Sequence, residues 1–173
     1  MADFNGTWKI DVSRSEMWSY DEQRYLPEEV GEEIITISIK DGVQDYEVLY
    51  GDDPVMRMGY TAKFDDAEWV PYLVREIIPK DTTRNLDESI EEFRKRIKAD
   101  AAGNERHFEV GKPYGMIRLV WVDDRTHYRF QRTATGEAQN VMMRRMSEDG
   151  QAYLSSLMDR DGVVFRTRWF LRT

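Results

Sequence analysis

The sequence contains no cysteine. This absence excludes disulfide bonds, catalysis by a thiol and any metal site built from thiolates. Histidine is almost as scarce, since His107 and His127 are the only two. Two histidines without cysteine make a weak metal site. We therefore predict no metal and no other cofactor.

Long apolar runs are also missing. No stretch approaches the roughly 20 apolar residues that a membrane-spanning helix needs. The opening residues, MADFNG, are not a basic segment followed by an apolar one, so no secretory signal is predicted. We expect a cytoplasmic protein without a membrane span.

Basic residues are outnumbered, with 25 Lys and Arg against 33 Asp and Glu. The imbalance is uneven: residues 1–113 hold 15 basic and 26 acidic residues, a net charge of −11, whereas residues 114–173 hold 10 and 7, a net charge of +3. The ten basic residues of the second part are all arginine, but the acidic total opposes the attraction to phosphate that nucleic-acid binding needs. We predict no nucleic-acid partner, and the oligomeric state is left open.

The sequence is rich in period-two alternation of apolar and polar residues, which is typical of β-strands. Tight-turn sequences such as KDG, GDDP, SEDG and DRDG separate the segments. The 173 residues fit one domain, 1–173, a mainly β antiparallel up-and-down barrel of about 8–10 strands, with non-strand insertions at about 13–33 and 79–113. The predicted strands are 6–12, 34–40, 43–50, 55–64, 72–78, 116–122, 126–132, 140–147, 152–158 and 163–173.

One inserted α-helix is predicted at about 86–99. Asn85 is a favourable N-cap residue, and Glu88 follows it at the spacing of a capping box. Acidic residues occupy the first turn and basic residues the last, which matches the helix dipole. The helix is expected to lie across an end or a flank of the barrel.

Strand alternation assigns residues to an inner and an outer face. It predicts an interior of aliphatic, aromatic and methionine side chains, with most arginines outside, and a solvent-facing His127. Five residues are the predicted apolar lining of a ligand cavity: Tyr46, Met58, Tyr60, Tyr128 and Trp169.

Two charged residues fall in line with the predicted interior. Glu76 alternates with Val74 and Ile78, and Arg144 lies between Met142 and Met146. A buried charge is unfavourable unless it is paired. Glu76 and Arg144 therefore form a structural ion pair, or contact a ligand separately, or are assigned to the wrong face at strand ends.

Segments at the two ends of the chain, and one at 126–128, resemble the calycins, the superfamily of lipocalins and intracellular fatty-acid-binding proteins. FNGTWKI is similar to their G-x-W opening, THY at 126–128 to the lipocalin T-D-Y motif, and VVFRTRWFLRT to the closing strand of a fatty-acid-binding protein. The resemblance implies that Trp8 plugs one end of a barrel and that an arginine of the closing strand, Arg166 or Arg168, packs across it. It implies the fold and not a fatty-acid ligand.

The expected function is the binding of a small hydrophobic molecule, with or without an anionic group, inside the barrel. Tyr46, Met58, Tyr60, Tyr128, Arg144 and Trp169 are the predicted ligand-binding residues. The alternative is a cofactor-independent enzyme, a lyase, isomerase or hydrolase, that acts on a hydrophobic small molecule in the same cavity. Glu76 would then be the acid/base group, and His107 is a second catalytic candidate.

Overall fold

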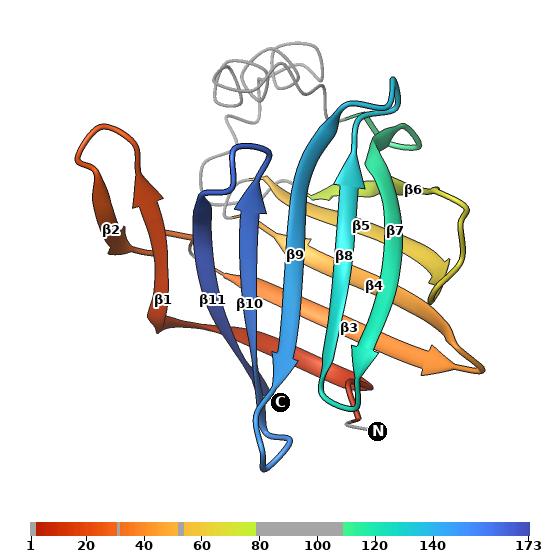
Figure 1. The fold of residues 1–173 in the computed structure, drawn as a ribbon, viewed down its shortest axis with the longest axis horizontal. Helices are drawn as coiled ribbons and strands as arrows, with labels where there is room; N and C mark the ends of the chain where they lie inside the picture. Colours follow the sequence, from red (N-terminus) through yellow and green to blue (C-terminus); the bar gives the residue numbers. More distant parts are fainter. Residues whose placement is uncertain (1–2, 31, 52–53, 79–108) are drawn as a thin grey trace.

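The structure, a computed structural model, describes residues 3–30, 32–51, 54–78 and 109–173, and these residues form eleven β-strands (Figure 1). No helix among them is long and apolar enough to cross a membrane. The strands are β1 (Gly6–Ser19), β2 (Arg24–Pro27), β3 (Glu33–Lys40), β4 (Val43–Tyr50), β5 (Val55–Lys63), β6 (Val70–Ile78), β7 (Pro113–Asp123), β8 (Thr126–Arg132), β9 (Ala138–Met146), β10 (Ala152–Asp159) and β11 (Val164–Arg172).

Consecutive strands pair antiparallel from β3 to β11, and β1 pairs with both β3 and β11. The ring therefore closes on itself, with Trp8 opposite Ile35 on one side and opposite Arg172 on the other. Closure satisfies the backbone groups that an open sheet would leave at its edges. The predicted antiparallel barrel is confirmed, with ten strands in the ring and β2 as a short addition to β1.

The barrel has two walls that cross each other (Figure 1). Strands β7–β11 form the nearer wall in this view, and β3–β6 form the wall behind it. The backbone turns sharply between paired strands where the sequence has Asp-Gly pairs. Asp41 and Gly42, for example, have positive φ angles of 51° and 75°, a conformation that Asp tolerates and Gly adopts freely.

The predicted non-strand insertion at 13–33 is wrong in its first part. Strand β1 runs on to Ser19, and Arg24–Pro27 forms β2 beside it. The reason is a bulge in β1. Asp11 pairs with Trp169 and Glu16 pairs with Thr167, so the four residues of β1 between Asp11 and Glu16 lie opposite a single residue of β11. The bulge breaks the alternation by which the strand was recognised. The helix predicted at 86–99 lies outside the described residues.

One end of the barrel is filled by aromatic side chains. Trp8 is fully buried, and its indole N–H donates to the carbonyl of Phe4 at 2.9 Å. The ring packs edge-on against Tyr153, with 4.9 Å between centroids. The guanidinium of Arg172 lies 4.4 Å from the centre of the Trp8 ring. Burial of Trp8 against an arginine of the last strand is confirmed, but that arginine is neither Arg166 nor Arg168.

The face assignment of two strands is also wrong. On β8, His127, Arg129 and Gln131 are buried together with Thr126 at the start of the strand, whereas Tyr128 and Phe130 are only half-buried. On β11, Arg168 and Phe170 are buried, and Trp169 is not. Here the polar residues point inward because these strands line the polar part of the barrel interior.

Candidate functional site

The barrel encloses a cavity of about 520 Å³. Strands β3–β5 contribute mostly apolar lining: Ile35, Tyr46, Val48, Met56 and Met58. Strands β8 and β9 contribute mostly polar lining: Arg129, Gln131, Gln139, Asn140 and Met142. These strands belong to the two opposite walls of Figure 1, so the cavity has an apolar side and a polar side.

The cavity reaches the surface near the turn that joins β1 to β2. Tyr20 and Asp159 are among its lining residues, and Tyr20 is 55% exposed. The Tyr20 hydroxyl donates to the Asp159 carboxylate, and this hydrogen bond, with smaller effects of burial and of the Asp159 charge, raises the pKa of Tyr20 to about 12. Tyr25 donates to the carbonyl of Val164 at 2.8 Å. These bonds attach the β1–β2 hairpin to β10 and to the start of β11 beside the opening.

Arg129 is the charged residue of the polar side. It lines the cavity, is 6% exposed, and has its guanidinium 5.4 Å from the centre of the Tyr72 ring and 5.9 Å from that of Tyr46. Its Nε has no hydrogen-bond partner, and no carboxylate of the described residues lies within ion-pair distance of it. Burial raises the pKa of Tyr46 and Tyr72. These hydroxyls therefore stay neutral and do not balance the charge of Arg129.

Arg144 is not part of the cavity lining and lies behind it, in the core. It is fully buried, with its guanidinium 4.8 Å from the centre of the Tyr46 ring and 5.9 Å from that of Tyr153. Its Nη1 is 3.3 Å from Nε2 of His127. Among the described residues, its Nε and Nη2 have no hydrogen-bond partner.

His127 is buried beside Arg144, not exposed to solvent as predicted. Burial, and then the charges of Arg144 and Arg129, hold the pKa of His127 well below its usual value. The imidazole is therefore neutral. Because a guanidinium only donates, Nε2 accepts and Nδ1 carries the proton. A neutral histidine leaves the charge of Arg144 unbalanced.

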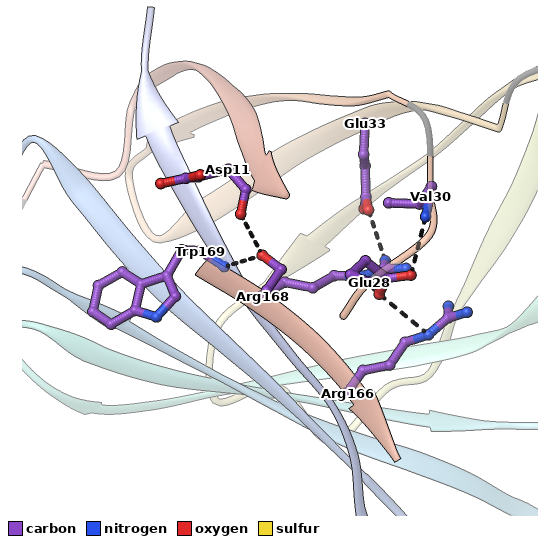
Figure 2. A network of polar contacts seen from close by, with 8 residues as sticks. Asp11, Glu28, Val30, Glu33, Arg166, Arg168 and Trp169 are labelled. Carbon is purple, nitrogen blue, oxygen red and sulfur yellow. Dashed lines mark hydrogen bonds and ion pairs between the residues drawn. The ribbon is translucent and has the colours of Figure 1, made fainter. Parts of the chain in front are cut away.

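A second arginine cluster is balanced by acids (Figure 2). Arg168 donates from Nε to Glu28 at 2.8 Å and from Nη1 to Glu33 at 2.6 Å, and Nε of Arg166 lies 3.6 Å from Glu28. The side chains of Glu28, Glu33 and Arg168 are 1%, 8% and 6% exposed. We call Glu28, Glu33, Arg166 and Arg168 the ion-pair network. Glu33, Arg166 and Arg168 also line the cavity.

The bulge in β1 carries the backbone that supports this network. The Ser15 hydroxyl donates to the carbonyl of Asp11 at 2.7 Å and accepts from the Trp169 N–H at 3.0 Å. The Glu28 N–H donates to the Ser15 carbonyl at 3.0 Å. The bulge therefore joins β11 to the segment that carries Glu28.

The two glutamates of the network respond differently to their surroundings. Burial by itself raises the pKa of Glu28, but the hydrogen bond and charge of Arg168, the charge of Arg166 and the Val30 N–H lower it to below its usual value. At Glu33 burial is the larger effect and outweighs the charge of Arg168, so its pKa is raised.

The inner charges of the barrel therefore fall into two groups. Arg166 and Arg168 have two carboxylates between them, whereas Arg129 and Arg144 contact none among the described residues. A buried cation without a counter-charge is unfavourable. Of the two unbalanced cations, Arg129 is the one that faces the cavity.

The structure brings together part of the predicted ligand-binding set. Tyr46 and Met58 line the cavity. Tyr60 lies against them in the core, stacked on Tyr46 at 4.8 Å and donating from its hydroxyl to Gln44 at 2.8 Å. Arg144 contacts the Tyr46 ring but does not itself line the cavity.

The other predicted site residues lie elsewhere. Tyr128 and Trp169 face outward, on the opposite side of their strands from Arg129 and Arg168. Glu76 also faces outward: its side chain is 52% exposed, 3.3 Å from Arg57. Of the alternatives for Glu76 and Arg144, the ion pair inside the barrel does not form, and the assignment of Glu76 to the inner face is wrong. His107 lies outside the described residues.

Arg129, Gln131, Glu33 and Arg168 were missed as cavity residues. The side of β8 on which Arg129 lies is fixed by the register between β8 and β9. This register pairs His127 with Arg144, so a buried Arg144 places His127 and Arg129 inside too. Arg168 and Glu33 come together only through barrel closure, and no sequence signal marks them.

In comparisons with known proteins, no protein-family model matches this chain, and no curated protein matches it either.

Proposed function

We propose that the barrel binds a small, largely apolar molecule that carries an anionic group, and that Arg129 holds this group. The observation that carries the proposal is the position of Arg129, which lines a cavity of about 520 Å³ without a carboxylate partner among the described residues. Cavities that bind small molecules commonly measure about 300–1,000 Å³, with apolar walls and few polar groups.

The two sides of the cavity suit the two ends of such a molecule. Ile35, Val48 and Met58 offer an apolar surface, and methionine adapts to ligands of irregular shape. On the other side, the planar guanidinium of Arg129 can donate in parallel to the two oxygens of a carboxylate, or to two of the three oxygens of a sulfonate. A bound anion would supply the missing counter-charge.

The contact between Trp8 and Arg172 supports a relationship to the calycins as part of this proposal. It pairs the tryptophan of the first strand with an arginine of the closing strand at 4.4 Å. The closed antiparallel ring around a cavity agrees with that resemblance.

Binding of the fluorescent anion 8-anilinonaphthalene-1-sulfonate tests the role of Arg129. We expect the wild-type protein to bind it and Arg129→Met to raise the Kd about tenfold or more, because a charge-assisted hydrogen bond contributes about 1.5–3 kcal/mol. Fluorescence titration at constant ionic strength measures the Kd. Native mass spectrometry of freshly purified protein would show whether a natural ligand co-purifies.

Two matched variants serve as controls. Arg160→Met removes the same charge from an exposed turn, and Arg144→Met removes it from behind the cavity. Both are expected to leave the Kd within about threefold of the wild type, which is under about 1 kcal/mol. An unchanged Kd in Arg129→Met, or an equal loss in Arg144→Met, would contradict the proposed anchor.

Catalysis in the same cavity is the second candidate, and one observation favours it. Glu33 is a buried carboxyl group that lines the cavity and has a raised pKa, a property of acid/base residues. If a co-purified molecule is converted to product, Glu33→Gln should abolish turnover and leave binding of the anionic probe intact. Turnover that survives in Glu33→Gln would rule out this role.

A further inference from the structure

Three amide side chains line the polar side of the cavity next to Arg129. They are Gln131 on β8 and Gln139 and Asn140 on β9, two strands that lie side by side in the nearer wall of Figure 1. We call these three residues the amide cluster. Gln131 lies two residues from Arg129, so both side chains point to the same face of β8, about 7 Å apart along the strand.

A bulge in β9 turns one more amide inward than regular pairing would. Asn140 pairs with Gln131. Ala138 then pairs with Arg132, so Gln139 has no partner residue in the register of β8 and β9. In a regular strand, neighbouring residues point to opposite faces, yet Gln139 and Asn140 both line the cavity. Bulges next to functional sites re-aim side chains in this way.

A glycine on β7 leaves the space for the two glutamines. A Cβ atom at Gly115 would lie 2.9 Å from Oε1 of Gln139 and 3.0 Å from Nε2 of Gln131. It would also lie 3.1 Å from the carbonyl oxygen of Arg132. The φ angle of Gly115 is not in the left-handed region, so the close approach of these groups, and not the backbone conformation, requires glycine here.

The amide cluster offers a ligand both donors and acceptors. Gln131 donates from Nε2 to Oε1 of Gln139 at 2.8 Å, and this bond does not use the N–H groups of Gln139. Oδ1 of Asn140 is buried and has no hydrogen-bond partner among the described residues. An uncharged group that both donates and accepts would therefore suit the cluster.

We propose that the amide cluster binds a hydroxyl group of the ligand, which makes the ligand a hydroxylated, largely apolar anion; this inference rests on the proposed function of the cavity. A hydroxyl group can donate to Oδ1 of Asn140 and accept from the amide of Gln139. An ammonium group only donates, and the charge of Arg129 repels it. A second anion would leave the Asn140 oxygen without a donor.

Strand register sets the orientation of the ligand. Asn140 pairs with Asp159, which lies at the opening of the cavity. Arg129 pairs with Met142, two residues further from the opening along β9. The hydroxyl group therefore lies nearer the opening, and the anionic group lies deeper in the barrel.

Two matched anions, 2-naphthoate and 6-hydroxy-2-naphthoate, test this inference. They differ only by a hydroxyl group on the ring that does not carry the carboxylate. We expect the full chain to bind the hydroxylated anion about fivefold more tightly or better, the factor that one net hydrogen bond supplies. Isothermal titration calorimetry at pH 7 and constant ionic strength measures both Kd values.

Two variants disturb the amide cluster in different ways. Gln139→Met removes the amide from a half-buried side chain, and Gly115→Ala displaces both glutamines through its Cβ atom. Each should reduce the preference to within about twofold and leave the Kd of 2-naphthoate within about threefold of the wild type. Gln151→Met makes the same change as Gln139→Met at an exposed position and should keep the full preference.

The outcomes separate this inference from the proposed function. Binding of 2-naphthoate that is lost in Arg129→Met, without a preference for the hydroxylated anion, would overturn the inference and leave the proposed function standing. A preference that persists in both Gln139→Met and Gly115→Ala would also overturn it. If neither anion binds, the proposed function fails and the inference fails with it.

Discussion

Replacing Trp8 by alanine is expected to lower the free energy of unfolding by about 3–5 kcal/mol, the range for removal of a large buried aromatic side chain. Trp8 is fully buried and contacts Tyr153 and Arg172. Its removal opens a void at the closed end and leaves the Phe4 carbonyl without its indole donor. Urea unfolding followed by circular dichroism gives the free energy.

Trp69 provides the matched control. It is half-buried in the turn before β6, where Arg132 lies 4.3 Å from the centre of its ring. Trp69→Ala removes the same atoms from the surface and is expected to have an effect below about 1.5 kcal/mol. Equal effects of the two substitutions, or a change within about 0.5 kcal/mol for Trp8→Ala, would show that Trp8 does not close the barrel.

Arg168→Met is expected to have an effect of similar size, about 3–5 kcal/mol at neutral pH, because it leaves the buried Glu33 without its hydrogen-bonded cation and leaves Glu28 with Arg166 alone, at 3.6 Å. Arg168 bonds both Glu28 and Glu33, and these residues join β11 to the segment between β2 and β3. Urea unfolding at neutral pH measures the loss. A loss below about 1 kcal/mol would contradict the structural role of the network.

The effect of Arg168→Met should depend on pH. In the wild type, the pKa of Glu28 is below its usual value of 4.5, so its stabilisation is present above that value and is lost as the pH falls through the lower, folded-state pKa. Without Arg168, burial is the main effect on both carboxyl groups and raises the pKa of each. Raised acid pKa values favour the folded state at low pH, so the difference between variant and wild type should shrink towards pH 4 and grow towards pH 7.

A compensating triple variant separates the charge effect from the loss of packing. Glu28→Gln and Glu33→Gln, added to Arg168→Met, remove the unpaired charges and should restore much of the lost stability. The pH dependence of the loss should also disappear. A triple variant no more stable than Arg168→Met alone would show that packing around Arg168, and not its charge, is what matters.

The sequence by itself determined the strands and the kind of sheet they form. Period-two alternation between turns with Asp-Gly or Asp-Asp pairs marks the segments without reference to their neighbours, because both signals depend only on local backbone preferences. Nine of the ten predicted strands therefore agree with those of the ring to within three residues at each end, and the exception is β1, which runs seven residues beyond its predicted end. The position of Trp8 at a buried end was implied by the resemblance of its G-x-W segment to the calycins.

Which face of a strand points inward was decided by register. Alternation predicts that Tyr128 and Arg144 both point inside, yet Tyr128 pairs with Met143, and His127 pairs with Arg144. Paired residues lie on the same face, so the two assignments exclude each other. Alternation shows that a strand has two faces, and on β8 and β11 the outer face is the more apolar one, so hydrophobicity pointed to the wrong side.

The charged interior was decided by the tertiary structure alone. Arg168 meets Glu28 and Glu33 across 140 and 135 residues of sequence, through the bulge in β1 and the closure of β11 on β1. Arg129 is a cavity residue only because β8 lies opposite the apolar strands β3–β5. Such contacts depend on how distant strands are arranged around the ring, and no local preference of the chain records that arrangement.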